Sequence, residues 1–251
     1  MNALRALYVA NGREFLRERI NWITTILMPL FFAGFFGLIF SGTELPGGPG
    51  GTPLRMVDMV FPGMLGLAML WLGLFGTTMP LVGLREQQVL RRLGVTPLSR
   101  LTILAAQVAW RVTVGICQSV LFVAFGRLAF GVQVVGNLGL LAAAVLLGTL
   151  VFVTMGYLLA AVSRSQDAAT AITQIVNLPM MMLSSSFFSL DAIPSFLKPV
   201  VDFIPLTYLA DAFRQLMVAY PPLHPLWLDF AVLGGWLVVL TGLSLRFFRW
   251  E

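Results

Sequence analysis

Long uninterrupted apolar blocks, separated by short charged segments, make up most of this chain. Soluble helices and strands bury one face and therefore alternate apolar with polar residues at a period of about 3.6 or 2, and these blocks show no such alternation. About twenty consecutive apolar residues suffice for a helix to cross the roughly 30 Å hydrocarbon core of a bilayer. The pattern therefore predicts an all-α integral membrane protein that forms a single transmembrane domain over residues 1–251. Its six membrane-spanning helices are expected at residues 20–43, 59–84, 101–126, 138–162, 168–190 and 226–246.

One uncharged stretch is too long for a single crossing. It extends from Arg127 to Arg164 and encloses 36 uncharged residues. Gly131, Gly136 and Asn137 are typical turn residues within it. We therefore expect the chain to turn there, between the third and the fourth span.

Three segments outside the spans are also expected to contact the membrane or a partner. Residues 1–19 place Leu7 and Phe15 near one helical face and arginines elsewhere, which is typical of an amphipathic helix that lies in the membrane interface. Residues 85–100 form a charged cytoplasmic connection between the second and third spans. Residues 191–225 carry six prolines among apolar runs, and we expect short re-entrant helices there, on the extracellular side and shielded by protein.

Composition and charge distribution support lipid as the solvent and fix an orientation. Apolar residues make up 58% of the chain and charged residues 11%, about half of the roughly 25% charged share that is usual for soluble domains. No basic stripe with interleaved aromatics is present, so no nucleic acid partner is expected. Eleven arginines fall on one side of the six-span plan and four basic residues on the other. Because Lys and Arg are retained on the cytoplasmic side, both termini are predicted to be cytoplasmic, in a multi-pass protein of a plasma membrane such as the bacterial inner membrane.

The chain lacks the residues for ATP hydrolysis and for the usual metal or cofactor sites. A phosphate-binding loop needs Gly-x-x-x-x-Gly-Lys, and Lys198, the only lysine, follows Leu197 in the expected outer segment. Cys117 is the only cysteine and His224 the only histidine, which excludes an intrachain disulfide, a haem held by two histidines and a zinc site with three histidines. We also expect no Ser-His-Asp site. We interpret His224 as a loop residue of the outer face. We expect no catalytic residue, no metal and no cofactor in this chain.

The segment 85–100 carries more than a simple connection requires. Leu90 and Leu93 form a small apolar strip on an otherwise charged short helix, which Pro97 stops. Two interpretations stay open for it, a solvated positive anchor on the cytoplasmic side or a docking helix for a cytosolic partner.

Two stretches of sequence carry a family resemblance. The first is Arg85-Glu86 followed by Leu90-Arg91-Arg92-Leu93 and Thr96-Pro97-Leu98-Ser99-Arg100. It resembles the coupling segment of type-2 ATP-binding-cassette (ABC) exporter permeases, which commonly read acid, Gly-Thr-Leu, basic residues, Leu, then Thr-Pro-x-Ser-Arg. The second stretch covers residues 183–194 and 204–208, LSSSFFSLDAIP and IPLTY, and is similar to the same family's fifth-span end and extracellular re-entrant region.

The chain departs from the family pattern at several positions. Gln88 and Val89 stand where the family usually has Gly-Thr, and Ser185, Ser189 and Ile204 stand where it has Gly, Pro and Asn. These differences affect the local backbone of the coupling turn and of the outer gate.

The resemblance implies an export subunit of the drug-resistance-like branch, with partners that the residues alone would not reveal. Such a subunit dimerises with an identical or different protomer, and one ABC ATPase subunit, two per complex, docks under each coupling helix. ATP and Mg are bound by the ATPase, and a path opens between protomers when ATP closes the ATPase pair. The coupling residues that this implies are Glu86, Leu90, Arg91, Arg92, Leu93, Thr96 and Pro97.

Polar side chains at membrane depth are the candidates for a translocation path or a dimer interface, because a charge at the bilayer centre costs at least about 2.5 kcal/mol. Arg111 lies within the third span, with Gln107 and Gln118 on the same helical face. It either snorkels or makes a structural pair, or it lines a cavity. The fifth span carries a polar stripe that either holds helices together or lines a conduit. Its members are Thr170, Gln174, Asn177 and Ser184.

The first span carries closely spaced phenylalanines, among them Phe32 and Phe36. They either face lipid or core, or they form an aromatic conduit wall that suits sugars and flat lipophilic drugs.

The leading hypothesis is thus the permease subunit of an ATP-driven exporter of a lipophilic compound or drug. A subunit that exports polysaccharide or lipid-linked glycan is the alternative. An ion-coupled carrier is less favoured because it needs acidic or histidine residues within its spans, whereas the acids from Asp58 to Asp229 lie at span ends. An intramembrane enzyme is not favoured, because no nucleophile, base or metal set converges.

Overall fold

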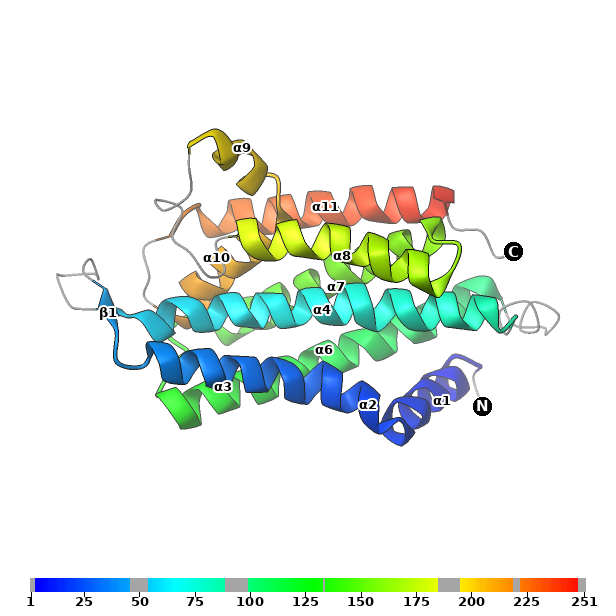
Figure 1. Ribbon diagram of the computed structural model, residues 1–251, viewed down its shortest axis with the longest axis horizontal. Helices are drawn as coiled ribbons and strands as arrows, with labels where there is room; N and C mark the ends of the chain where they lie inside the picture. Colours follow the sequence, from blue (N-terminus) through cyan, green and yellow to red (C-terminus); the bar gives the residue numbers. More distant parts are fainter. Residues whose placement is uncertain are drawn as a thin grey trace.

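The computed structural model describes residues 3–45, 54–88, 99–132, 134–184, 195–218 and 222–247. Its long helices run along a common axis as an elongated bundle (Figure 1). The long helices are α3 (Met28–Phe40), α4 (Met56–Glu86), α6 (Arg100–Phe130), α7 (Leu138–Val162), α8 (Gln166–Leu183) and α11 (Leu226–Phe247).

Shorter elements lie before the bundle and at its ends. Helix α1 (Ala3–Arg17) turns away from the direction of α3 at one end of the bundle (Figure 1). The short helix α2 (Arg19–Trp22) and the π-helical turn η1 (Ile23–Leu27) connect α1 to α3. The other short elements are the paired strands β1 (Glu44–Leu45) and β2 (Leu54–Arg55), the 3-10 turn η4 (Ser195–Leu197), α9 (Lys198–Val201) and α10 (Pro205–Met217).

Five helical segments are long and apolar enough to cross a membrane. They are Ile23–Phe40, Met56–Glu86, Thr102–Phe130, Leu138–Val162 and Leu226–Phe247. The prediction of a helical membrane protein is confirmed, with one two-residue strand pair as the exception to an all-α fold.

Helix α8 occupies the place of the expected fifth span but is not among these five segments. Its 18 described residues include Asp167, Gln174 and Asn177, which lower its hydropathy. Residues 185–190 of the expected span lie outside the described residues. A six-span layout therefore stays a prediction.

Local capping chemistry sets several helix ends. Helix α6 ends at Gly131, whose φ of 68° is the left-handed conformation that glycine adopts without strain. Helix α7 begins after Asn137, whose side-chain oxygen accepts the N–H of Gly139 at 2.7 Å. The turn expected within the long uncharged stretch is therefore confirmed. Helix α8 begins in the same way, since the Ser165 hydroxyl accepts the N–H of Ala168 at 3.2 Å.

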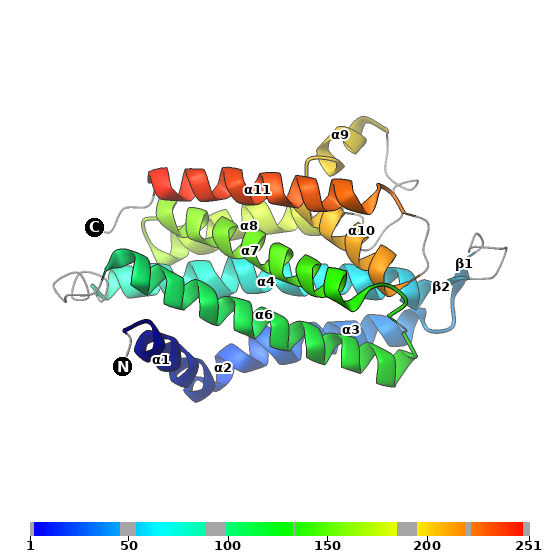
Figure 2. The ribbon, with the colours of Figure 1, turned by 180° about the vertical axis from the view of Figure 1, so that it is seen from behind.

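Helix α4 forms the centre of the bundle. It lies between α3 and α8 in the front view and behind α6 and α7 in the reverse view (Figure 1 and Figure 2). Its most apolar 18-residue window is 83% buried, against 17% for the corresponding windows of Ile23–Phe40 and Leu226–Phe247. The two outer segments therefore present apolar faces to the surroundings, as lipid-facing helices do.

Glycines allow α4 and α7 to pack with their backbones in contact. A Cβ built on Gly156 would lie 2.2 Å from the carbonyl oxygen of Gly73. The Thr78 hydroxyl donates a hydrogen bond to the Gly156 carbonyl at 3.0 Å. Small residues and a polar side chain thus hold these two helices together, as is typical of membrane helix pairs.

The two ends of the bundle differ in character. The start of α1, the last turn of α4 and the end of α11 lie at one end, and the strand pair, α9 and α10 at the other (Figure 1). Helix α10 is buried except at Gln215, and the buried Arg214 side chain donates to the Met59 carbonyl at 3.1 Å. Short helices are therefore present within residues 191–225, as expected. Their re-entry into a bilayer and the cytoplasmic side of the termini stay predictions.

Candidate functional site

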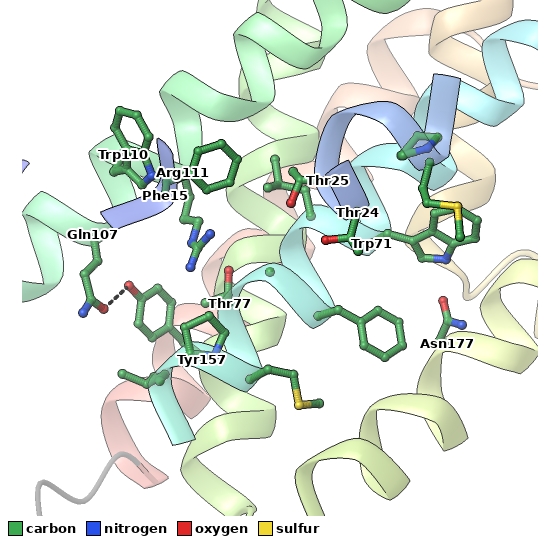
Figure 3. A pocket seen from close by; sticks show the side chains of 18 of the residues that line it. Phe15, Thr24, Thr25, Trp71, Thr77, Gln107, Trp110, Arg111, Tyr157 and Asn177 are labelled. Atoms are coloured by element: carbon green, nitrogen blue, oxygen red, sulfur yellow. Dashed lines mark hydrogen bonds between the residues drawn. The ribbon is translucent and has the colours of Figure 1, made fainter. Parts of the chain in front are cut away.

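A cavity of about 700 Å³ lies among α1, η1, α3, α4, α6, α7 and α8 (Figure 3). Its volume falls within the range of about 300–1,000 Å³ that is usual for sites of drug-sized molecules. Several residues predicted for the path or the dimer interface line it. These are Phe32, Gln107, Arg111, Gln174 and Asn177.

The remaining predicted path residues lie elsewhere. Gln118 is buried and donates to the Thr25 carbonyl at 2.9 Å, which ties α6 to the π-helical turn. The Thr170 hydroxyl donates to the Gln166 carbonyl at 2.9 Å. The buried Ser184 hydroxyl donates to the Met181 carbonyl at 3.4 Å. Each of these side chains thus donates to a backbone carbonyl, whereas the buried Gln118 Oε1 has no partner among the described residues.

Phe36 is the last of the predicted path residues that do not line the cavity, and it belongs to a row of stacked aromatic rings on α3. Its ring stacks on Phe32 with centroids 6.5 Å apart and on Phe40 at 6.1 Å. Phe32 continues across the cavity wall, since its ring meets Trp71 of α4 edge to face at 5.7 Å. Phe36 therefore supports the cavity wall through Phe32.

Aromatic rings from three elements form the apolar walls of the cavity. Trp110 of α6 packs edge to face against Phe15 of α1, with centroids 5.8 Å apart. Trp71 and Phe75 of α4 line the wall beside Phe32. The rings offer large rigid surfaces to a flat or greasy ligand.

A polar band lies within these walls. The Tyr157 hydroxyl donates to Gln107 Oε1 at 3.1 Å, and Figure 3 shows this bond at the edge of the cavity. Two buried oxygens, Thr77 Oγ1 and Asn177 Oδ1, have no hydrogen-bond partner among the described residues. Buried polar atoms are almost always paired with protein, water or ligand. The cavity thus contains polar groups that are free to bind a guest.

Arg111 brings a cationic group to this band. It is half-buried, and its side chain points into the cavity (Figure 3). Its Nη1 lies 3.8 Å from the position that a Cβ on Gly76 would take, so the guanidinium reaches across to α4. The interpretation of Arg111 as a cavity residue fits this placement.

The two residues that begin the coupling segment are fixed to neighbouring helices. Arg85 donates to the Ala160 carbonyl at 3.3 Å and also to the Ser163 carbonyl, at the end of α7. Glu86 Oε1 accepts the backbone N–H of Gln166, the first residue of α8, at 2.9 Å. The other predicted coupling residues lie outside the described part of the chain. They are Leu90, Arg91, Arg92, Leu93, Thr96 and Pro97.

Gln88 has a left-handed backbone with φ 57°. This is the position at which the resembled family usually has glycine. A residue with a Cβ is strained in this region. The chain therefore departs from the family's glycine at a position where the coupling turn has a left-handed backbone.

A second polar cluster, at the opposite end of the bundle, was not expected from the sequence. The buried carboxylates of Asp211 and Asp229 face His224, and the candidate ligand atoms of the three residues lie within 4.8 Å of one another. The Gln215 amide donates to Asp211 at 3.1 Å and to Asp229 at 2.9 Å. Because this amide already lies among the acceptors, we interpret the cluster as a structural link between α10 and α11.

No sequence motif predicts this cluster. From the sequence, His224 is expected to be a loop residue of the outer face and Asp229 one acid among several at span ends. The backbone N–H of His224 donates to Asp211 at 3.0 Å, and α11 brings Asp229 to the same place only after folding.

Comparison with known proteins shows which family the chain resembles. The family model described as ABC-2 type transporter matches residues 2–218. The ycf38 protein of Cyanophora paradoxa, whose name describes a transport permease, is 28% identical over 219 residues, which cover 85% of this chain and 74% of that protein. ABC transporter G family member 20 of Dictyostelium discoideum is 26% identical over 113 residues, 44% of this chain and 16% of that protein. The family match includes every residue that lines the cavity.

Proposed function

Because the chain belongs to the ABC-2 type transporter family, we propose that it is the membrane-spanning permease subunit of an ATP-driven exporter, which carries a lipophilic compound or drug outward. Permeases of this family normally work with an ABC ATPase, and the permease is the transport component of such a system. In this proposal two ATPase subunits bind ATP and Mg, and a second permease protomer completes the path.

One observation carries the substrate class, namely an aromatic-walled cavity of about 700 Å³ among membrane-spanning helices. A compound of drug size fits this volume, and Phe32, Trp71 and Trp110 supply the apolar surface that would draw it from water or lipid. A glycan or lipid-linked glycan is the second candidate, since the same rings also stack on sugars.

The position of the coupling end supports the ATPase side of the proposal. Arg85 and Glu86 fix the start of the coupling segment to α7 and α8. Helix α8 in turn carries Gln174 and Asn177 to the cavity. A push on the coupling segment from an ATPase in the cytoplasm would therefore move one wall of the cavity.

The surface of α8 supports a second protomer. Thr170 and Gln174 are exposed in the single chain, and polar side chains are unfavourable against lipid. A neighbouring protein or a water-filled path would supply hydrogen-bond partners for these two side chains. We therefore place the partner protomer, identical or different, against this face of α8.

Transport by inside-out vesicles tests the function. We expect uptake of a fluorescent lipophilic dye that requires both ATP and the co-expressed ATPase. Phe32→Ala should lower this uptake several-fold because it removes a cavity wall. Phe31→Ala is the matched control, since the neighbouring ring is 63% exposed and does not line the cavity.

Three outcomes would count against the proposal. Uptake without the ATPase would refute an ATP-driven exporter. Equal effects of Phe32→Ala and Phe31→Ala would remove the cavity from the path. Export of a labelled glycan with no dye uptake would favour the second candidate.

A further inference from the structure

The charged groups inside the cavity indicate a narrower class of substrate than a lipophilic compound in general. Among the residues that line the cavity, Glu14 and Arg111 are charged. Glu14 comes from α1 at the end of the bundle, whereas Arg111 comes from the middle of α6. Of the two charged residues that line the cavity, Arg111 is therefore the one contributed by a spanning helix.

Arg111 has no acidic partner in the part of the chain that the structure describes. The ion pairs within 4.0 Å that are seen among the described residues include Arg55 with Asp58 and Asp211 with His224, and none involves Arg111. Glu14 also lines the cavity but does not lie within 4.0 Å of the guanidinium. A guanidinium that is partly removed from water needs an anion or several acceptors to offset the loss of its hydration.

The guanidinium lies against α4 inside the bundle. Its Nη1 lies beside Gly76, ten residues before Glu86 at the end of α4, which is about 15 Å along the helix axis. Gly76 has no side chain, so the guanidinium can approach the α4 backbone closely. This placement inside the bundle favours a cavity role over snorkelling, in which the side chain bends out to the interface.

Neutral polar groups line the same cavity and do not neutralise Arg111. Gln107 Oε1 already accepts the Tyr157 hydroxyl. Asn177 and Thr77 are 5% and 3% exposed, and Asn177 Oδ1 and Thr77 Oγ1 have no partner among the described residues. The Thr77 hydroxyl can donate to a bound acidic group, whereas the Asn177 amide nitrogen already donates to Gln174 Oε1 at 3.4 Å and its Oδ1 can accept from a guest.

On the basis of the proposed function, we propose that the exported compound is a lipophilic monoanion. Its carboxylate, sulfonate or phosphate group binds the Arg111 guanidinium, which matches the planar geometry of such groups through two parallel N–H bonds. Its apolar body lies against Phe32, Trp71 and Phe75. Glu14 disfavours a second negative charge toward the α1 side of the cavity.

Equilibrium binding to the permease–ATPase complex in nanodiscs tests this inference. The probes are pyrenebutyrate and its neutral methyl ester, which share one ring system and differ in charge, with empty nanodiscs as the blank. We expect the wild-type complex to bind the acid more tightly than the ester. Arg111→Gln should weaken binding of the acid about tenfold or more, the range for loss of a charge-assisted hydrogen bond, and leave the ester within about twofold. Arg111→Lys should restore part of the loss.

Arg127→Gln is the matched control, because Arg127 is exposed at the far end of the same helix. Equal binding of acid and ester to the wild-type complex would overturn the inference, and this comparison needs no variant to fold. An equal loss of acid and ester in Arg111→Gln would also overturn it, because it would show general damage to the cavity.

Failure of the proposed function has a different signature. If neither probe stimulates ATP hydrolysis or is transported, the exporter proposal fails even where the acid binds. If the ester is transported as well as the acid and Arg111→Gln changes neither, the exporter stands and the monoanion is wrong.

Discussion

The carboxylate of Glu86 accepts the backbone N–H of Gln166 at 2.9 Å and thereby joins the last residue of α4 to the first residue of α8. The N–H groups of a first helical turn lack partners within the helix and attract negative charge. Glu86 therefore holds α8 by its N-terminus. Because α8 also lines the cavity through Gln174 and Asn177, this bond is a direct mechanical link from the coupling segment to the site.

Glu86→Ala should uncouple ATP hydrolysis from transport. Removal of the carboxylate frees the start of α8, so we expect the number of molecules transported per ATP to fall about threefold or more, for a loss near 1 kcal/mol. Proteoliposomes in which both rates are measured give this ratio. Gln87→Ala is the control, because Gln87 is an exposed neighbour. A wild-type ratio in Glu86→Ala would show that the bond carries no coupling.

Gln88→Gly should stabilise the coupling turn. Glycine adopts the φ of 57° found at Gln88 without the penalty of about 1 kcal/mol that a Cβ brings. A thermal unfolding assay in detergent should show a small rise in the midpoint. Gln87→Gly should do the opposite, since Gln87 has φ −76° and glycine there only adds freedom to the unfolded chain. A shift of the unfolding midpoint in the same direction for both substitutions would refute this explanation.

Gly156→Ala should destabilise the bundle. The new Cβ would lie 2.2 Å from the Gly73 carbonyl oxygen, and two packed backbones cannot yield as a flexible side chain can. We expect a loss of about 2 kcal/mol or more, in the range of overpacked cores, visible as a lower unfolding temperature and reduced yield. Gly235→Ala should be tolerated, because nothing lies within 4 Å of its added Cβ. A wild-type unfolding temperature for Gly156→Ala would contradict this close packing.

Single cysteines on α8 should report on the partner protomer. Cys117 is exposed and is first replaced by serine. A cysteine at Gln174, which is exposed on the polar face of α8, should then crosslink two protomers if they are identical, or the two different permeases if they are not. A cysteine at Val239, 55% exposed on α11, serves as the lipid-facing control. No crosslink at any position along the α8 stripe would place the dimer interface elsewhere.

Much of the architecture follows from local sequence. The long uninterrupted apolar blocks predicted the spanning helices, because in lipid every backbone group of a span must be paired within the helix. The turn at Gly131 and Asn137 was also predictable, since a left-handed glycine and a side-chain cap act over a few residues. The family resemblance of the coupling segment likewise rests on neighbouring residues, and the family match confirms it.

Only some of the residues that line the cavity were predictable from the sequence. A helical periodicity placed Gln107, Arg111 and Gln118 on one face, yet Gln118 bonds the Thr25 carbonyl and leaves the cavity to the other two. Glu14, Trp71 and Tyr157 entered the cavity without any sequence signal. Which side chains meet depends on the rotation and approach of each helix.

The sequence by itself therefore determined that the chain is a helical membrane protein, where the turn between α6 and α7 lies, and which family its motifs resemble. The tertiary structure alone decided that Arg111 shares a cavity with α4 and that Asp211, His224 and Asp229 meet at the opposite end. The physical reason is the separation along the chain of the residues that make contact. Span length and caps depend on contacts within a few residues, whereas both clusters depend on close packing between distant helices, such as the contact of Gly73 with Gly156.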